Sequence, residues 1–275
     1  MQRQSSAKEL RARVRAYHKN FGRHTLPWRK NKAPYCVFVS EYMLQQTGVE
    51  RVIPKFNAFI KKFPTFKKLA RATLPEVLSL WQGLGYNRRA KYLRDAAVRI
   101  VGEKGGVLPN DREYLQSLPG IGPYTAGAIQ AFAFGNPEPF VETNIRTTVI
   151  HHCFSKKRLV RDADVLAVLK SLTPPRGTRA RQWYAALMDY GAYLKKEGHR
   201  LNARSFHYVK QKPFKGSRRE LRGLLMRSLL SSQKTDKELA HTLTKSRADI
   251  RTELVRLEKE GLVKRGVGEG WKLAR

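Results

Sequence analysis

The chain has 275 residues, of which 41% are hydrophobic and 10% aromatic, so a disordered protein is excluded and two domains with a sizeable core are possible. Lys and Arg number 55 against 22 Asp and Glu, and the formal net charge of +33 indicates a polyanionic partner, above all nucleic acid. An anionic membrane is the alternative partner. However, no apolar run of about 18 residues and no signal peptide is found, so we expect a cytoplasmic protein, nucleoid-associated in a prokaryote.

Apolar periodicity predicts helices, and no clear β alternation, through roughly the first two hundred residues. Helices are expected over 6–20, 35–48, 49–63 with an interruption at Pro54, 65–70, 75–80 and 88–104. A loop is expected over 21–29, a turn at Gly83-Leu84-Gly85, and a helix end at Gly105-Gly106.

Residues 115–147 are the most informative stretch. An apolar-periodic segment leads to Pro119-Gly120, then to Gly122 and a helix-forming run over 125–132, which predicts helix, tight glycine turn, helix. Glycines let the backbone turn sharply, and N–H groups at a helix N-terminus favour an anion, here a nucleic-acid phosphate. A helical hairpin whose glycines only allow close packing is the alternative.

Further helices are expected over 145–154, 162–172 and 181–195, which completes an all-α domain over residues 1–195. Residues 196–218 form a basic segment that we interpret as a linker. The tail, 219–275, has three expected helices (221–230, 235–243 and 248–260) and two expected strands (261–265 and 270–273). This pattern resembles a winged helix-turn-helix module, with a protein-interaction or packing module as the alternative.

The two cysteines, Cys36 and Cys153, each lie in an apolar run. Two thiols cannot make a disulfide framework or a four-cysteine metal site, so we expect buried structural thiols, a reducing compartment and no metal site.

Several motifs together resemble one family. The segment from Leu118 to Ala128 resembles the helix-hairpin-helix of the HhH-GPD DNA glycosylases, and four further segments resemble the adenine glycosylase branch, MutY: 26–29 (Leu-Pro-Trp-Arg), 34–35, 40–47 and 81–86. The resemblance covers about residues 8–195 and implies an all-α helix-hairpin-helix glycosylase fold, here followed by a small winged-helix-like (α+β) domain. The implied protein is a monomeric, monofunctional DNA N-glycosylase of base-excision repair, whose partner is double-stranded DNA with a mismatched or damaged base.

Two carboxylates are the candidate catalytic pair. Glu41 has mostly apolar neighbours on its expected helix, so its pKa should be raised by desolvation, and the resemblance makes it the acid that protonates the departing base. Glu142 lies where a helix begins, with Thr143 or Asn144 available as cap, so it should stay ionised and stabilise a cationic sugar. A role for Glu142 as helix cap alone is the alternative. The family has Asp at this position, and a displacement on the order of 1 Å can cost about a hundredfold in rate.

The resemblance assigns roles to other residues. Tyr124 occupies the hairpin position that bears Lys in bifunctional members, and a tyrosine cannot form a Schiff base, so no lyase activity is expected. Asn144 matches an Asn that positions the carboxylate or the nucleophilic water. Gln46 and Tyr86 match residues that enter the duplex near the orphaned base, with a core aromatic as the alternative for Tyr86. The remaining candidates are Gln45, Thr47, Arg88, Gly120, Gly122 and Thr125 for DNA binding, and Trp28 and Arg29 for the base pocket.

The sequence also departs from the family. Ala185 falls where MutY proteins carry a Gln or Glu that reads adenine, and residues 195–204 lack the four cysteines that hold an iron–sulfur cluster in most relatives. We therefore expect no cofactor, although the hairpin leaves room for a monovalent cation. No Nudix-like domain is recognised. The leading substrate is adenine opposite 8-oxoguanine or guanine. Thymine or uracil opposite guanine is the first alternative, and a non-catalytic DNA-binding regulator is the second.

Overall fold

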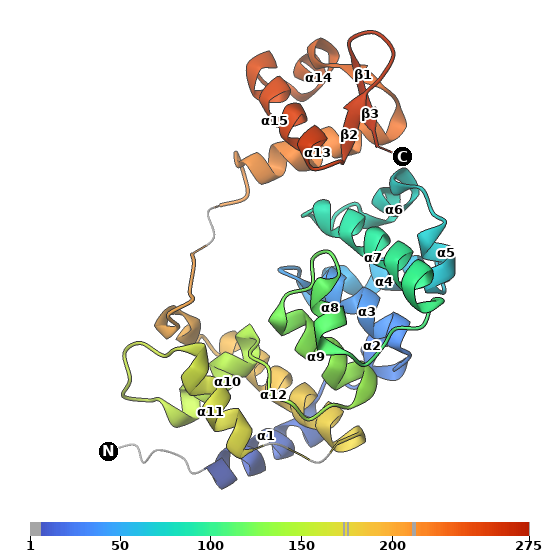
Figure 1. The fold of residues 1–275 in the computed structure, drawn as a ribbon. Helices are drawn as coiled ribbons and strands as arrows, with labels where there is room; N and C mark the ends of the chain where they lie inside the picture. The colour runs from blue at the N-terminus through green and yellow to red at the C-terminus, as the bar shows by residue number, and fades with distance from the viewer. Residues whose placement is uncertain (1–6, 173, 175, 211–212, 275) are drawn as a thin grey trace. The chain divides into compact units, whose positions relative to one another are not determined.

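The structure, a computed structural model, describes residues 7–172, 174, 176–210 and 213–274. Residue 6 of the first expected helix, residues 211 and 212 of the expected linker and residue 275 of the tail lie outside the described residues. The described part is mostly helical, as predicted, with one small sheet near the C-terminus (Figure 1). It divides into two compact units: Met1–Phe38, Asn110–Ser117 and Ile121–Lys210 form unit 1, and Val39–Pro109, Leu118–Gly120 and Gln211–Arg275 form unit 2. The predicted domain boundaries near residues 195 and 219 stay predictions.

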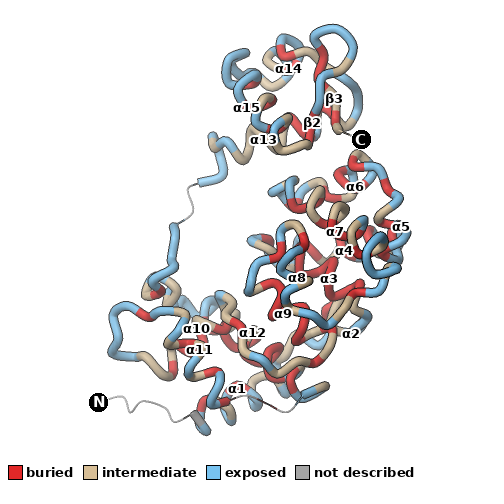
Figure 2. Tube along the Cα trace, viewed as in Figure 1, coloured by how far each residue is buried: buried red, intermediate tan, exposed pale blue. Residues whose placement is uncertain are grey.

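Unit 1 is built around a long helix near its C-terminal end. Its elements are α1 (Ala7–Phe21), α2 (Pro27–Lys30), the start of α3 (Pro34–Leu44), α8 (Arg112–Ser117), α9 (Pro123–Phe134), α10 (Thr143–Cys153), α11 (Asp162–Ser171), α12 (Thr178–Lys196) and the 3-10 helix η1 (Leu201–Arg204). Helix α12 packs against α1, α9 and α10. The core beneath it includes Phe140, Ile145, Tyr184 and Leu187, all of which are buried. Figure 2 shows in red where buried residues lie along the chain.

Two expectations for unit 1 need correction. The stretch 21–29 is not all loop, because α2 begins at Pro27, whose fixed φ suits the first position of a helix. Helix α10 is not capped by Thr143 or Asn144, because Glu142 itself is the N-cap residue. In addition, residues 201–206, inside the expected linker, belong to unit 1 and contribute a parallel bridge between Ser205 and Val160.

Unit 2 contains the rest of α3 and the helices that follow it. These are α4 (Val49–Lys62), α5 (Phe66–Ala70), α6 (Leu74–Trp81), α7 (Arg88–Lys104), α13 (Arg218–Ser231), α14 (Asp236–Leu243) and α15 (Arg247–Lys259), with strands β1 (Lys234–Thr235), β2 (Val263–Arg265) and β3 (Gly270–Leu273). Helix α7 has the predicted limits because Gly105, at φ 62°, adopts the left-handed conformation that ends helices. Helix α4 was expected to be interrupted, but it continues through Pro54, where the buried Val52 and Phe56 hold the apolar face in place.

The C-terminal elements form the predicted winged-helix-like fold of three helices and a small antiparallel sheet in the order β1-β3-β2 (Figure 1). Strand β1 was not predicted, because two residues are too short to show alternation. The side chain of Gln233 holds the turn between β2 and β3 through two hydrogen bonds with Val267, of 2.7 and 3.3 Å. Beneath the turn, the Arg265 guanidinium lies 3.7 Å from the centroid of the buried Trp271 ring.

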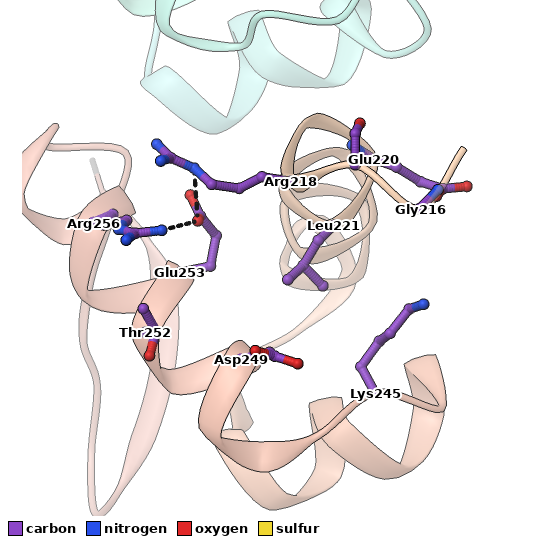
Figure 3. A pocket seen from close by; sticks show the side chains of 10 residues that line it. Gly216, Arg218, Glu220, Leu221, Lys245, Asp249, Thr252, Glu253 and Arg256 are labelled. Carbon is purple, nitrogen blue, oxygen red and sulfur yellow. Dashed lines mark hydrogen bonds and ion pairs between the residues drawn. The ribbon is translucent and has the colours of Figure 1, made fainter. Parts of the chain in front are cut away.

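A pocket lies beside α13 and α15 of this module (Figure 3). Glu253 is buried there, with one oxygen 3.0 Å from Arg218 and 3.3 Å from Arg256 and the other 2.8 Å from Arg222. The buried carboxylate of Glu253 is therefore paired with three arginines of the same module.

Candidate functional site

Hydrogen bonds join three turns of unit 2 that are distant in sequence: the turn after α3, the turn before α7 and the hairpin turn at Pro119 and Gly120. The Tyr42 hydroxyl, near the end of α3, donates to the Pro119 carbonyl of the hairpin, and the Gln45 side chain donates to the Gly120 carbonyl at 3.2 Å. Gly120 has a φ of 79°, and a β-carbon there would lie 2.7 Å from the Tyr92 ring. Both the backbone conformation and the packing therefore require glycine at this hairpin position.

Two residues predicted to enter the duplex have unusual backbone conformations. Gln46 and Tyr86 have φ values of 55° and 49°, in the left-handed region that non-glycine residues rarely occupy. Each such residue costs on the order of 1–3 kcal/mol and persists only where its surroundings enforce it. Both side chains are exposed, Tyr86 by 38%, so Tyr86 is not a core aromatic.

Arg89, which sequence reasoning missed, lies between these two turns. Its side chain is buried, and one terminal nitrogen donates to the carbonyls of Tyr42, Met43 and Gln45 at 2.8, 3.1 and 2.5 Å. The other donates to the Thr47 hydroxyl at 2.9 Å and to the carbonyls of Leu84 and Gly85 at 3.1 and 3.2 Å. No carboxylate is among these partners, and burial lowers the pKa of Arg89 to about 10. An arginine one position after the exposed Arg88 is the only signal the sequence offers.

The candidate acid Glu41 is also in unit 2. It lies on α3 and is only 5% exposed, in a run in which every residue from Tyr35 to Met43 is buried. The expected apolar neighbours Val37 and Phe38 are 2% and 0% exposed. The structure thus places Glu41 in the desolvated surroundings that the sequence predicts. It also places it about one helical turn before the Gln46 turn.

Glu142, in unit 1, caps helix α10. One carboxylate oxygen accepts from the backbone N–H groups of Asn144 and Ile145 at 2.7 and 3.3 Å, and the other accepts from the Asn144 side chain at 3.1 Å. The Lys195 ammonium in turn donates to the Asn144 side-chain oxygen at 3.1 Å. Burial raises the pKa of Glu142, although these backbone N–H groups and the charge of Lys195 oppose the shift. Burial thus opposes the helix N-terminus that the sequence argument invokes, and the ionised state of Glu142 stays a prediction. The convergence of Glu41 and Glu142 on one nucleotide stays a prediction.

The predicted base-pocket residue Arg29 binds a carboxylate of its own unit. Its two terminal nitrogens donate to the two oxygens of Asp189 at 2.7 and 2.9 Å, and Asp189 also accepts from Arg23 and lies 3.0 Å from His18. Burial raises the pKa of Asp189. The bonds from His18 and Arg29 and the charges of Arg29 and Arg23 outweigh that effect and hold the pKa well below its ordinary value. Asp189, on α12, was missed as a site-organising residue. Trp28 is half-buried next to Arg29 on α2.

The other candidates have varied surroundings. Tyr124 is half-buried on α9, with its ring 6.0 Å from Phe140. Gly122 is exposed as the N-cap of α9, and Arg88 is exposed at the start of α7. Thr47 and Thr125, in contrast, are buried, and their contact with DNA stays a prediction.

The segment that would carry cluster cysteines is bound to other parts of unit 1 by side-chain hydrogen bonds. Asn202 donates to the Thr147 hydroxyl at 2.9 Å, and Arg204 donates to the carbonyls of Phe154, Ser155 and Lys157. The two cysteines of the chain lie elsewhere, on α3 and α10, and burial raises the pKa of both thiols. Thiolates are the ligands such a cluster needs, so these residues do not fit one.

Neither a membrane-spanning helix nor a metal-binding cluster occurs in the described residues. Among residues 7–172, 174, 176–210 and 213–274, no helix has the length and apolar content required to cross a bilayer. In the same residues no group of His, Cys, Asp and Glu is arranged to hold a metal ion.

Comparisons with curated sequences give consistent results. A model of the HhH-GPD superfamily base excision DNA repair protein matches residues 39–175. Adenine DNA glycosylase of Mycolicibacterium smegmatis is 44% identical over 174 residues, which cover 62% of this chain and 58% of that protein. Adenine DNA glycosylase of Homo sapiens is 45% identical over 129 residues, which cover 44% of this chain and 24% of that protein. The chain thus spans about three fifths of the first relative and a quarter of the second.

Comparison with solved structures supports the same fold. A thermostable thymine-DNA glycosylase matches with a TM-score of 0.58 at 24% identity, over 68% of this chain and 86% of that chain. An endonuclease III in a non-covalent DNA complex matches with a TM-score of 0.52 at 21% identity, over 76% and 90%. The matched family model, the sequence relatives and the shared fold identify this chain as a member of the HhH-GPD superfamily of base excision DNA repair proteins.

Proposed function

We propose that this protein is a monofunctional DNA N-glycosylase that removes adenine opposite 8-oxoguanine or guanine. The observation that carries the proposal is the burial of Glu41 about one helical turn before the exposed, strained Gln46. A buried acid can hold a proton near neutral pH and deliver it to a departing base. The names of the curated relatives, adenine DNA glycosylases, point to the same base.

In the proposed reaction, the basic surface and the hairpin bind the duplex, and Gln46 and Tyr86 occupy the gap that the extruded nucleotide leaves. Glu41 protonates the base as the N-glycosidic bond breaks. Glu142 stabilises the resulting oxocarbenium-like sugar until water adds to it. Asn144, which bonds the Glu142 carboxylate, keeps that group in place. Tyr124 offers no amine, so the product is an intact abasic site.

A second substrate class is favoured by one observation. Ala185 is buried at 6% exposure and its side chain has no polar atom to read the edge of adenine. The backbone carbonyl of Ala185 lies 3.5 Å from Arg29, which is already bound to Asp189. Thymine or uracil opposite guanine is therefore the second candidate.

We further propose that the protein works as a monomer, on double-stranded DNA, without an iron–sulfur cluster. The lack of cysteines in 195–204 and the hydrogen bonds of Asn202 and Arg204 support the cluster-free reading. A monovalent cation at the hairpin stays a prediction, and the carbonyls of Pro119 and Gly120 already accept hydrogen bonds from side chains.

The test is single-turnover cleavage of duplexes that carry A·8-oxoguanine, A·G, T·G or U·G, followed by alkali to reveal abasic sites. We expect strand breaks in the two duplexes that contain adenine, and we expect them to form only after the alkali treatment. Products confined to the T·G and U·G duplexes would instead support the second substrate class. Tight DNA binding without any product would show a non-catalytic regulator. Affinity should fall steeply with salt, because a net charge of +33 displaces many counterions.

A further inference from the structure

The two turns proposed to enter DNA share one interior support. The turn after α3 contains Gln46, the turn before α7 contains Tyr86, and Arg89 donates hydrogen bonds to both. About forty residues separate the two turns in sequence, so no local interaction can set one relative to the other.

The hydrogen bonds of Arg89 lie at the peptide groups that determine the φ angles of Gln46 and Tyr86. The φ angle of a residue is set by the orientation of the peptide group before it. Arg89 binds the Gln45 carbonyl at 2.5 Å, which belongs to the peptide group before Gln46. It also binds the Gly85 carbonyl at 3.2 Å, which belongs to the peptide group before Tyr86. A single guanidinium therefore holds both peptide groups that define the left-handed conformations.

Arg89 also contacts the aromatic part of the second turn. Its guanidinium carbon lies 5.4 Å from the centroid of the Tyr86 ring and 5.5 Å from that of Trp81. The Trp81 indole donates to the Gly85 carbonyl at 3.1 Å, so the Tyr86 turn is fixed from two sides. Arginine suits this position because its planar fork presents several donors in fixed directions, whereas a lysine offers one ammonium.

The burial of this charge indicates function rather than stability. The buried Arg89 guanidinium loses its hydration, and its hydrogen-bond partners among the described residues are neutral carbonyl and hydroxyl oxygens, which supply no counter-charge. We infer that Arg89 is a positioning residue, which holds Gln46 and Tyr86 in the one geometry with which they can enter the duplex together. This inference rests on the proposed function, because it assigns those two side chains to the opening of a base pair.

The first test uses the free protein and needs no substrate. Backbone amide hydrogen exchange is compared for wild type, Arg89→Lys and Arg94→Lys. Arg94 lies on the same helix and donates to a single carbonyl, that of Ala72, at 2.6 Å, so it is a matched control. Arg89→Lys should speed exchange in residues 44–48 and 83–87 and leave α4 and α5 unchanged. Unchanged exchange in both turns, or an equal effect of Arg94→Lys, would overturn the inference.

The second test measures base opening and excision by a double-mutant cycle. The target adenine is replaced by 2-aminopurine to report opening, and excision is measured on the A·8-oxoguanine duplex. In the wild-type background, Arg89→Lys should lower both signals by about 10- to 100-fold, because a displacement near 1 Å is costly at such sites. In a Gln46→Ala/Tyr86→Ala background, the same substitution should change them by less than about threefold, because the residues through which it acts are gone.

An equal loss in both backgrounds would show that Arg89 is merely structural and would overturn the inference. If Arg89→Lys does not fold, Thr47→Val serves in its place, because it removes one acceptor of the guanidinium and keeps the side-chain shape. A wild-type protein that opens the 2-aminopurine pair but releases no base would refute the proposed enzyme. In that case the opening signal and the exchange rates would still decide the role of Arg89.

Discussion

Gly191 lies so close to the backbone of Asn144 that a β-carbon on Gly191 would stand 2.0 Å from the Asn144 carbonyl oxygen. This contact joins α12 to the first turn of α10, the helix that Glu142 caps. The position of the candidate carboxylate therefore depends on a glycine on another helix.

Gly191→Ala should separate α10 from α12 and lower the stability by about 1–3 kcal/mol, the usual cost of overpacking. It should also slow excision, because Asn144 and the Glu142 cap would shift. The matched control is Gly102→Ala on α7, where a β-carbon meets nothing within 4 Å. That change should be neutral or stabilising by up to about 1 kcal/mol, because alanine is the better helix former. Denaturant unfolding of both variants provides the measurement, and equal stabilities would contradict the packing argument.

Asp189→Asn should destabilise unit 1 by about 3–5 kcal/mol, because it leaves Arg23 and Arg29 without their buried counter-charge. The pKa of Asp189 is lowered in the folded protein, so its stabilising contribution is present above its ordinary value of 3.8. The contribution is lost as the pH falls from there toward the folded pKa. The stability of the Asp189→Asn variant should therefore lack the decrease that Asp189 causes in the wild type at acidic pH. As a control, Asp95→Asn on α7, which breaks partly exposed pairs with Lys91 and Arg94, should cost less than about 1 kcal/mol.

Glu41→Gln should reduce single-turnover excision by about 100-fold or more, because an amide cannot protonate the departing base. DNA affinity should stay within about threefold of wild type, because the buried side chain of Glu41 contributes little to the surface charge. Gel-shift binding and excision are measured on the same A·8-oxoguanine duplex. A variant that cuts at the wild-type rate would show that another group supplies the proton.

The acid side of the pH–rate profile should report Glu142. Burial raises its pKa above the ordinary 4.5, and only the anion stabilises the sugar cation, so excision should fall as the pH drops through a value above 4.5. The folding stability should depend on pH in the opposite direction to the excision rate. A raised folded pKa favours the folded state at low pH, and this contribution is lost as the pH rises through the folded pKa. Glu142→Gln should remove both the acid-side fall in excision rate and this pH dependence of stability. If the excision rate of the variant still falls at the same acidic pH, a group other than Glu142 is responsible.

Tyr124→Lys should introduce a primary amine on α9 where the wild type has none. We expect borohydride to trap the variant, but not the wild type, on DNA with an abasic site, because only a Schiff base is reduced. The variant should lose some stability, because the ring of Tyr124 packs against the core that contains Phe140. Trapping of the wild type would show lyase activity and contradict the monofunctional assignment.

Much of the helical fold could be predicted from local sequence. The limits of α7 follow from its apolar periodicity and from Gly105 and Gly106, and β3 has its predicted bounds. The burial of Glu41 also follows from the apolar residues around it on α3. These features depend on residues that are close in the sequence, within one helical turn or along one strand. Their spacing can therefore be read from the sequence.

Other features depend on groups that are distant in the sequence. The expected helix over 35–48 ends at Leu44, where Arg89 binds the last carbonyls of α3 and the turn that follows. The place of Arg29 in a base pocket stays a prediction, and its guanidinium is bound by Asp189, 160 positions away. No local sequence pattern predicts that Arg89 binds the end of α3 or that Asp189 binds Arg29.

The sequence by itself determined the helices, the hairpin, the strong positive charge and the family to which the chain belongs. Only the tertiary structure decided which polar groups are buried together: Arg89 with the Gln46 and Tyr86 turns, Asp189 with Arg29, and Asn144 against Gly191. The physical reason is that a buried charge or carbonyl must find a partner, and the partner can come from any segment that folding brings within hydrogen-bond distance.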